Sequence, residues 1–200
     1  MRNSRNDVVS AALRVLEAQG LENCSMRRVA AELDVQPSAL YHHVPNKQTL
    51  LALMADEIVA EVAPVVAVRG VPDTAAVIPN PGAARELCHR LRNAMLAVRD
   101  GADVVATAAA FRLGRSAVED RLAELVGADG ARTLLLYTFA QAQATQMQRQ
   151  AEAFGALLAQ HGTAPGDPAG VGDPEPVDLD ESFGRGLDIV LAGLGPVSFT

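Results

Sequence analysis

Cysteine is scarce in this sequence: Cys24 and Cys88 are its only two, and neither lies in a CxxC pair. A small disulfide-stabilised domain or a thiolate zinc site would need more cysteines at closer spacing. We therefore expect both thiols to be buried packing residues and predict no metal site and no cofactor.

Long apolar runs are also missing. A membrane-spanning helix needs about 20 consecutive apolar residues, whereas the longest candidates here are short segments such as residues 104–111. The first five residues, MRNSR, are polar and form no apolar signal core. We expect a cytoplasmic protein that makes no contact with a membrane.

The residue groupings typical of enzymes are absent as well. The sequence has no recognisable Ser/His/Asp or Cys/His arrangement, no cluster of carboxylates and no phosphate-binding glycine loop. Gly193 and Gly195 come at the end of the chain, with no strand before them. These absences predict that the chain is not an enzyme.

What the sequence does have is enough apolar material for a full core, 49% of its 200 residues, and an uneven distribution of charge. Residues 1–50 hold six Arg/Lys and five Asp/Glu, a net +1, which leaves eleven and nineteen, a net −8, for residues 51–200. The acidic part would repel an anionic polymer, so any contact with one is expected at the N-terminal part alone.

Helical periodicity dominates the chain, and no segment alternates with the period of a strand. It predicts helices over residues 4–19, 85–98, 102–113, 115–126, 130–161 and 181–194. Ser25 is expected to cap a helix ending near Asp34, with Val29, Ala30 and Leu33 buried, and Asn46 to cap a long helix over residues 47–62. Residues 70–84 are expected to be a connector and 162–180 a mobile loop, because both are rich in Pro and Gly.

Between these capped segments, residues 35–44 predict a turn and a short helix with Pro37 in its first turn. Two short helices joined in this way form a helix-turn-helix. The expected architecture is all-α: a three-helix helix-turn-helix domain over residues 1–46, then a larger helical domain over residues 47–200 that begins with a connecting helix, 47–63.

One run of residues carries a family resemblance. It comprises Gly20, the segment MRRVA at 26–30, Leu33, Val35, the segment LYHHV at 40–44, Asn46, Lys47 and Leu50. The run resembles the DNA-binding domain of TetR-family regulators. The segment RDGA at 99–102 and the apolar and glycine positions of 183–194 are similar to the regulatory domain of the tetracycline-repressor branch of that family. The resemblance implies a repressor that binds palindromic double-stranded operator DNA as a homodimer and is released by a small-molecule effector.

The second short helix of such a domain enters the major groove, so its first-turn side chains meet base edges. We expect Gln36, Pro37, Ser38 and Ala39 at this position, with Gln36 able to pair with adenine through two hydrogen bonds. The candidate backbone contacts are Arg27, Tyr41, His42, His43 and Lys47. Tyr41 alternatively covers the small core. The adjacent His42 and His43 point about 100° apart on a helix, which argues against a shared metal ion.

In the tetracycline-repressor branch the drug binds as a magnesium chelate, and the matching positions here are Ala63, Leu87, Leu91, Val105 and Gln146. Because these residues lack the branch's polar anchors, we expect no binding of tetracycline with magnesium. A cavity for a largely apolar ligand is expected instead, lined by Leu87, Leu91, Val105, Ala109 and Phe111 with Thr138, Gln141 and Gln146 as polar groups. The alternative for any of them is a filled core or, for the glutamines, a solvent-facing position.

Apolar residues on the last helix predict a dimer interface at Phe183, Leu187, Val190, Leu191 and Leu194. Together with the long helix before it, two copies would form a four-helix bundle. Two alternatives stay open: a ligand-dependent activator, and a helical DNA- or protein-binding module without an effector.

Overall fold

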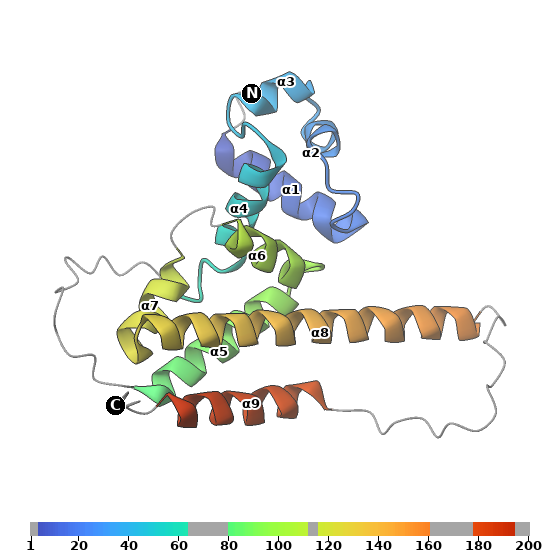
Figure 1. Ribbon diagram of the computed structural model, residues 1–200. Coiled ribbons are helices and arrows are strands. Elements are labelled where there is room, and N and C mark those ends of the chain that lie inside the picture. Colours follow the sequence, from blue (N-terminus) through green and yellow to red (C-terminus); the bar gives the residue numbers. More distant parts are fainter. Residues whose placement is uncertain (1–3, 64–79, 112–115, 161–177, 195–200) are drawn as a thin grey trace.

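The computed structural model describes residues 4–63, 80–111, 116–160 and 178–194, with side chains of α8 described as far as residue 156. These residues form helices and no strand, so the predicted all-helical fold is confirmed for them (Figure 1). The helices are α1 (Arg5–Gln19), α2 (Met26–Glu32), α3 (Pro37–Tyr41), α4 (Lys47–Ile58), α5 (Pro81–Leu96), α6 (Gly101–Ala110), α7 (Ala117–Val126), α8 (Ala128–Gln160) and α9 (Leu179–Gly193). None of them is long and apolar enough to cross a membrane.

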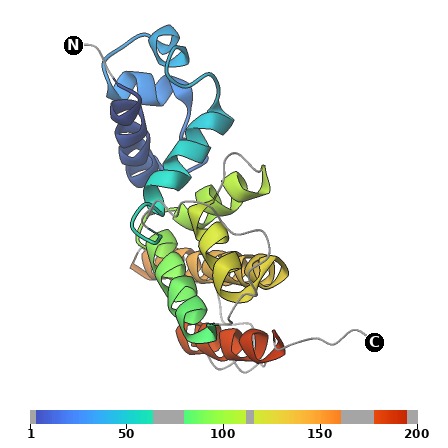
Figure 2. The same cartoon turned by 90° about the vertical axis from the view of Figure 1, so that its left-hand side faces the viewer.

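Helices α1 to α3 form a small head above a larger helical body, and α4 runs from one to the other (Figure 2). Local sequence signals set where these helices begin. Ser4 and Asp7 form a capping box on α1, and the side chains of Ser25 and Asn46 accept hydrogen bonds from the first turns of α2 and α4. Pro37 opens α3, where a missing N–H costs nothing.

The core of the head is built from apolar residues that the helical spacing brings to one side. Val8, Leu16, Val29, Leu40 and Leu50 are each at most 1% exposed. Leu33, which the pattern placed in this core, is only half-buried because α2 ends one residue before it. Cys24 is buried here and Cys88 in the body, as predicted, and burial raises the pKa of both thiols.

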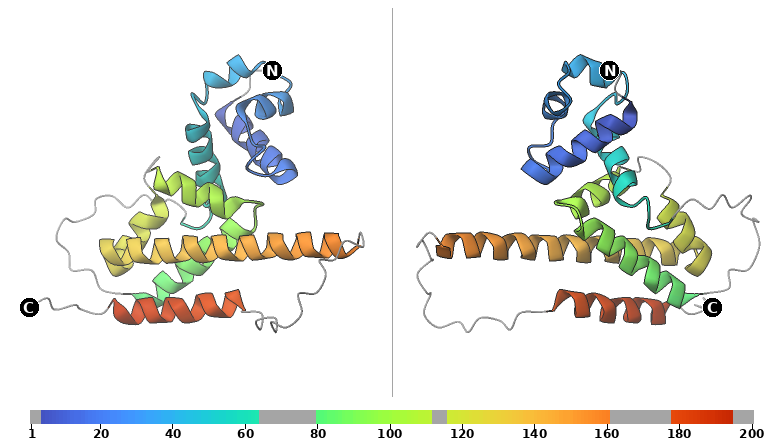
Figure 3. Two further views of the ribbon diagram at one scale, coloured as in Figure 1. Left: turned by 45° about the vertical axis from the view of Figure 1, so that its right-hand side comes forward. Right: turned by 180° about the vertical axis from the view of Figure 1, so that it is seen from behind.

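In the body, α8 is a single 33-residue helix that crosses α5, with α6 and α7 between it and the head and α9 on the far side (Figures 1 and 3). The C-terminal half of α8 extends beyond α9 and α5. Its residues 151–156 are all exposed.

Several predicted boundaries differ from the structure; α6, for example, ends at Ala110 and not at residue 113. Helix α4 ends at Ile58 and continues as turns through residue 62. Helix α5 begins at Pro81 because Asn80 caps it, so residues 81–84 are helical and not part of a connector. Asp178 likewise caps α9 through two backbone N–H groups, which places residues 179 and 180 in the helix. The rest of the expected connector and of the mobile loop lies outside the described residues.

The ring of Phe183 is the centre of the contact between α5, α8 and α9. Tyr137 stacks on it with ring centroids 5.6 Å apart, His89 meets it edge-on at 5.1 Å, and the Arg92 guanidinium lies 4.9 Å from the ring centroid. The Tyr137 hydroxyl donates to the backbone carbonyl oxygen of Phe183 at 3.1 Å. These contacts fix α9 on its own protomer.

The close packing of Tyr137 on α9 leaves no room for a side chain at Gly186. A Cβ at this position would overlap the Tyr137 hydroxyl. We expect Gly186→Ala to lower the free energy of unfolding by about 1–3 kcal/mol, because the tyrosine must leave its place.

Gly193→Ala is the matched control on the same helix, since nothing lies within 4 Å of a Cβ there. It is expected to be neutral or stabilising by up to about 1 kcal/mol. Urea denaturation followed by circular dichroism, at one protomer concentration, compares the two variants. Equal stability of both would contradict the assigned packing.

Candidate DNA-binding surface and ligand cavity

The turn between α2 and α3 presents α3 at the tip of the head. Asp34 adopts a left-handed backbone conformation with φ of 54°, and the N–H of Val35 returns to the carbonyl of Ala30 at 3.0 Å. Leu40 and Val44 are buried and anchor α3 from below. The geometry is that of a helix-turn-helix, as the sequence predicted.

The predicted base-contacting residues lie together at the exposed start of α3. Gln36, Ser38 and Ala39 are exposed and Pro37 is half-buried. Gln36 precedes the helix and makes no capping hydrogen bond with its side chain, which leaves its amide available to a partner. This surface can enter a major groove without rearrangement of the core.

The predicted backbone-contacting residues surround this tip. Arg27, Tyr41, His42 and Lys47 are exposed and His43 is half-buried. Tyr41 is 50% exposed, so it does not serve as a core residue of this head. Lys47 opens α4, where the positive end of the helix adds to its attraction for phosphate.

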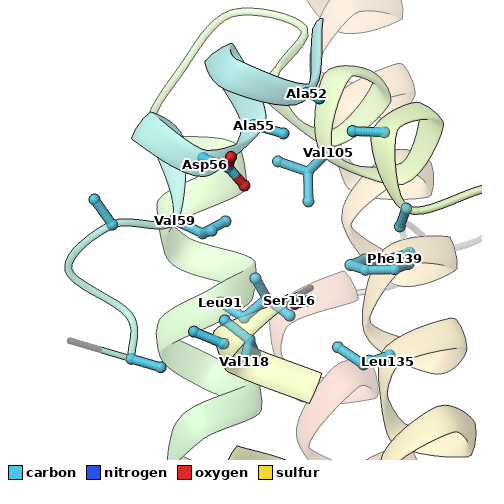
Figure 4. Close-up of a pocket in the computed structure, with 15 residues that line it drawn as sticks. Ala52, Ala55, Asp56, Val59, Leu91, Val105, Ser116, Val118, Leu135 and Phe139 are labelled. Atoms are coloured by element: carbon cyan, nitrogen blue, oxygen red, sulfur yellow. The ribbon is translucent and has the colours of Figure 1, made fainter. Parts of the chain in front are cut away.

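A cavity of about 360 Å³ lies where α4 meets the body. Residues from five helices and from the turns at their ends line it, and nearly all of them are apolar (Figure 4). They are Ala52, Ala55, Asp56, Val59, Ala60, Ala63, Leu91, Val105, Ala108, Ala109, Ser116, Ala117, Val118, Leu135 and Phe139. Its volume falls in the range of small-molecule sites.

Three of the eight predicted ligand residues, Leu91, Val105 and Ala109, line this cavity. The other five lie elsewhere: Leu87 is in the core, Phe111 is 54% exposed at the end of α6, and Gln141 is half-buried on α8. Thr138 donates to the carbonyl of Leu134 within its own helix. Gln146 forms hydrogen bonds with Ala102 and Asp103 of α6. The expectation that all eight residues share one cavity is therefore corrected to three.

The sequence interpretation missed the contribution of α4 to the cavity. Ala52, Ala55, Asp56 and Val59 recur at helical spacing and lie on one face of that helix. The spacing is visible in the sequence, but a cavity wall and a packed core have the same pattern.

Within this wall, Asp56 differs from its neighbours. Among the described lining residues it alone is charged, and Ser116 is the other polar one. Burial raises the pKa of the Asp56 carboxyl above its ordinary value. The Asp56 side chain is exposed to solvent.

A hydrogen-bond network at the start of α6 joins the head to the body. Asp100, in a left-handed conformation at the start of α6, accepts from the Leu21 N–H of the head at 2.7 Å and from the Gln150 amide of α8 at 2.7 Å. The Arg99 guanidinium donates to the carbonyl oxygen of Glu17, at the end of α1, at 3.1 Å. The last turn of α1 is thereby fastened to α6.

The next turn of α6 is fastened to α8 by Gln146. Its amide oxygen accepts from the buried Ala102 N–H at 3.1 Å, and its NH₂ group donates to Asp103 at 2.7 Å. Gln143 donates to the other oxygen of Asp103 at 2.8 Å. Gln146 thus holds a structural position in the protomer.

Two of the predicted dimer residues face inward. Phe183 and Leu187 are fully buried within the protomer, where Tyr137 and Arg92 cover the phenylalanine ring. Val190, Leu191 and Leu194 are half-buried against the same core. Among the described side chains of α8 and α9, the large apolar ones that stay exposed are Leu136, Met147, Phe154 and Ile189, at 62–74%.

Comparison with known proteins places this architecture in a family. Residues 8–54, the head and the first turns of α4, match the sequence model of the "Bacterial regulatory proteins, tetR family". Over 60 residues the chain is 42% identical to the class E tetracycline repressor of Escherichia coli, covering 30% of this chain and 28% of the repressor. The sequence match thus spans less than a third of that relative.

Solved structures are similar over nearly the whole chain. Mycobacterium smegmatis BioQ is 28% identical with a TM-score of 0.72, over 96% of this chain and 98% of that one. BioQ with its double-stranded DNA operator is 32% identical with a TM-score of 0.60, over 81% and 98%. Streptomyces coelicolor ActR in complex with (S)-DNPA is 25% identical with a TM-score of 0.65, over 97% and 98%. The chain belongs to the TetR family of bacterial regulatory proteins.

The position of Gln146 generates a prediction about the body. Gln146→Met keeps most of the side-chain volume but leaves the buried Ala102 N–H without a partner, and we expect it to lower the free energy of unfolding by about 1–3 kcal/mol.

Gln148→Met, two residues further along α8, is the control, because the Gln148 amide donates to Glu152 at an exposed position of the same helix. It is expected to change stability by less than about 0.5 kcal/mol. Urea denaturation of both variants measures the difference. An equal change in the free energy of unfolding of both variants would mean that the Gln146 hydrogen bonds between α6 and α8 do not contribute to stability.

Proposed function

We propose that this protein is a transcriptional repressor that binds palindromic operator DNA as a homodimer and releases it when a small, largely apolar molecule enters the cavity. The observation that carries the proposal is the shared helix α4, which begins beneath the DNA-binding tip and ends as a wall of the cavity. The similarity to BioQ, whose structure was solved with its operator, supports the DNA-binding half.

On DNA, the exposed start of α3 would lie in the major groove, with Gln36, Ser38 and Ala39 against base edges. Gln36 is suited to adenine and Ala39 to the methyl group of thymine. Tyr41, His42, His43, Arg27 and Lys47 would hold the flanking backbone. The acidic body leaves the head as the only surface that phosphates would approach.

The homodimer would form through the exposed apolar face of α8 and α9. Leu136, Met147 and Phe154 are 11 and 7 residues apart in the numbering, which puts them on one side of α8. Ile189 lies on the neighbouring helix and is 74% exposed. This set replaces Phe183 and Leu187 in the proposed four-helix bundle, and Val190, Leu191 and Leu194 would lie at its edge.

A ligand would act by favouring a position of α4 that misaligns the two heads. The cavity opens between α4 and α6, so an occupant touches both helices directly. A differential affinity of a few kcal/mol between the two states is sufficient to release DNA. The ActR complex with (S)-DNPA supports a small-molecule site in this fold, and the apolar lining at Leu91 and Val105 argues against a magnesium chelate.

The test is a fluorescence anisotropy titration of the protein against a library of genomic fragments. The palindromic site that binds best is then titrated at several salt concentrations. We expect Gln36→Ala to weaken binding by about 1–3 kcal/mol per half-site and to relax preference at one base pair. Lys47→Ala should weaken all sequences similarly and reduce the salt slope by about one per half-site.

Gln48→Ala, at an exposed position beside Lys47, is the control and should bind like the wild type. A wild-type protein that prefers no site over random DNA would contradict the repressor function. A Gln36→Ala variant with unchanged sequence preference would contradict the assigned role of α3.

A further inference from the structure

We propose that the effector of this protein carries a cationic group, such as a protonated amine, on an otherwise apolar body, and that Asp56 binds this group. The inference rests on the ligand-sensing function proposed above and specifies its ligand class. Its basis is the arrangement of charge around the cavity.

Asp56 is placed to meet a ligand. It lies in the last turn of α4, and Figure 4 shows its carboxylate directed into the space between α4 and Val105 of α6. Leu91 and Phe139 contribute apolar surface to the same cavity. A molecule that fills this space would bring one polar group next to the carboxylate and bury the rest of its surface against hydrocarbon.

No group within the described part of the chain neutralises this carboxylate. Asp56 forms no hydrogen bond or ion pair there, and desolvation is the sole cause that raises its pKa. Arg90, which reaches the end of α4 from α5, donates to the backbone carbonyl of Glu61. The carboxylate is partly desolvated and has no counter-charge among the described residues, so a cationic ligand in the cavity would be its ion-pair partner.

The end of α4 adds to this preference. The last turn of a helix carries partial negative charge from its free carbonyl groups, which a cation stabilises. The last turn of α4 contains no basic residue that would do so within the protein. Cation and helix end would therefore attract each other at the position that Asp56 occupies.

The charge of the body acts in the same direction at longer range. Residues 51–200 carry a formal net charge of −8, from eleven Arg/Lys and nineteen Asp/Glu. Such a field raises the local concentration of cations and lowers that of anions. A carboxylate ligand would approach against this field and then face Asp56, so anionic effectors are disfavoured.

The test uses ligands that share a shape and differ in charge. Adamantan-1-amine, adamantan-1-ol and adamantane-1-carboxylate form one set, and naphthalen-2-ylmethylamine, naphthalen-2-ylmethanol and 2-naphthoate a second. Isothermal titration calorimetry of the full chain measures each affinity. In at least one set the amine is expected to bind about ten-fold or more tightly than the alcohol, the size of one charge-assisted hydrogen bond, with the carboxylate weakest.

Two variants locate the effect. Asp56→Asn keeps the shape and removes the charge, and should reduce the advantage of the amine over the alcohol to about two-fold or less. Glu57→Gln removes the same charge from the adjacent residue, which does not line the cavity, and should keep the advantage. Thermal denaturation by circular dichroism checks that both variants are folded.

Equal affinities within both sets, a preference for the alcohol or carboxylate, or no amine binding at millimolar concentration would overturn the proposal. The proposal would also be overturned if Asp56→Asn and Glu57→Gln reduced the affinity advantage of the amine over the alcohol equally. Operator binding by the wild type without ligand is measured separately. Its absence would count against the repressor function, whereas calorimetry tests the cation site without DNA.

Discussion

The structure depends on one packing constraint: α4 belongs to two cores at once. One face of α4 packs on α1 and buries Leu50 and Met54, while its other face meets α6 and lines the cavity. A helix held on both sides cannot adjust to one core without disturbing the other, because close-packed interiors transmit small displacements. The DNA-binding tip and the cavity are therefore parts of one mechanical unit, although they lie at opposite ends of this helix (Figure 2).

The hydrogen bonds at the start of α6 reinforce this unit. Asp100 and Arg99 hold the end of α1, and Gln146 holds the following turn of α6 against α8. Helix α6 thus contacts the head, the cavity and the long helix of the proposed dimer interface. A ligand that shifts α6 has a direct path to the heads, and the cationic ligand inferred from Asp56 would act on α4 from the same cavity.

Local signals made the head predictable from the sequence. Ser25 and Asn46 cap the helices that directly follow them and Pro37 opens its own helix, so these caps and this turn could be located without tertiary information. The cavity and the outward face of α9 could not be located in this way. Whether an apolar residue faces its own core or solvent depends on partners distant in the chain, as Phe183 shows: Tyr137, His89 and Arg92 enclose it, while Ile189 on the same helix stays exposed.

The most direct test of the coupling is hydrogen exchange of the protein with and without operator DNA, read by mass spectrometry. Energetic coupling is reciprocal, so DNA bound at the head must stabilise the cavity walls if cavity occupancy is to control DNA binding. We predict slower exchange in the last turns of α4 and in α6, far from the DNA. Protection confined to residues 26–47, with unchanged exchange in α6, would contradict the account.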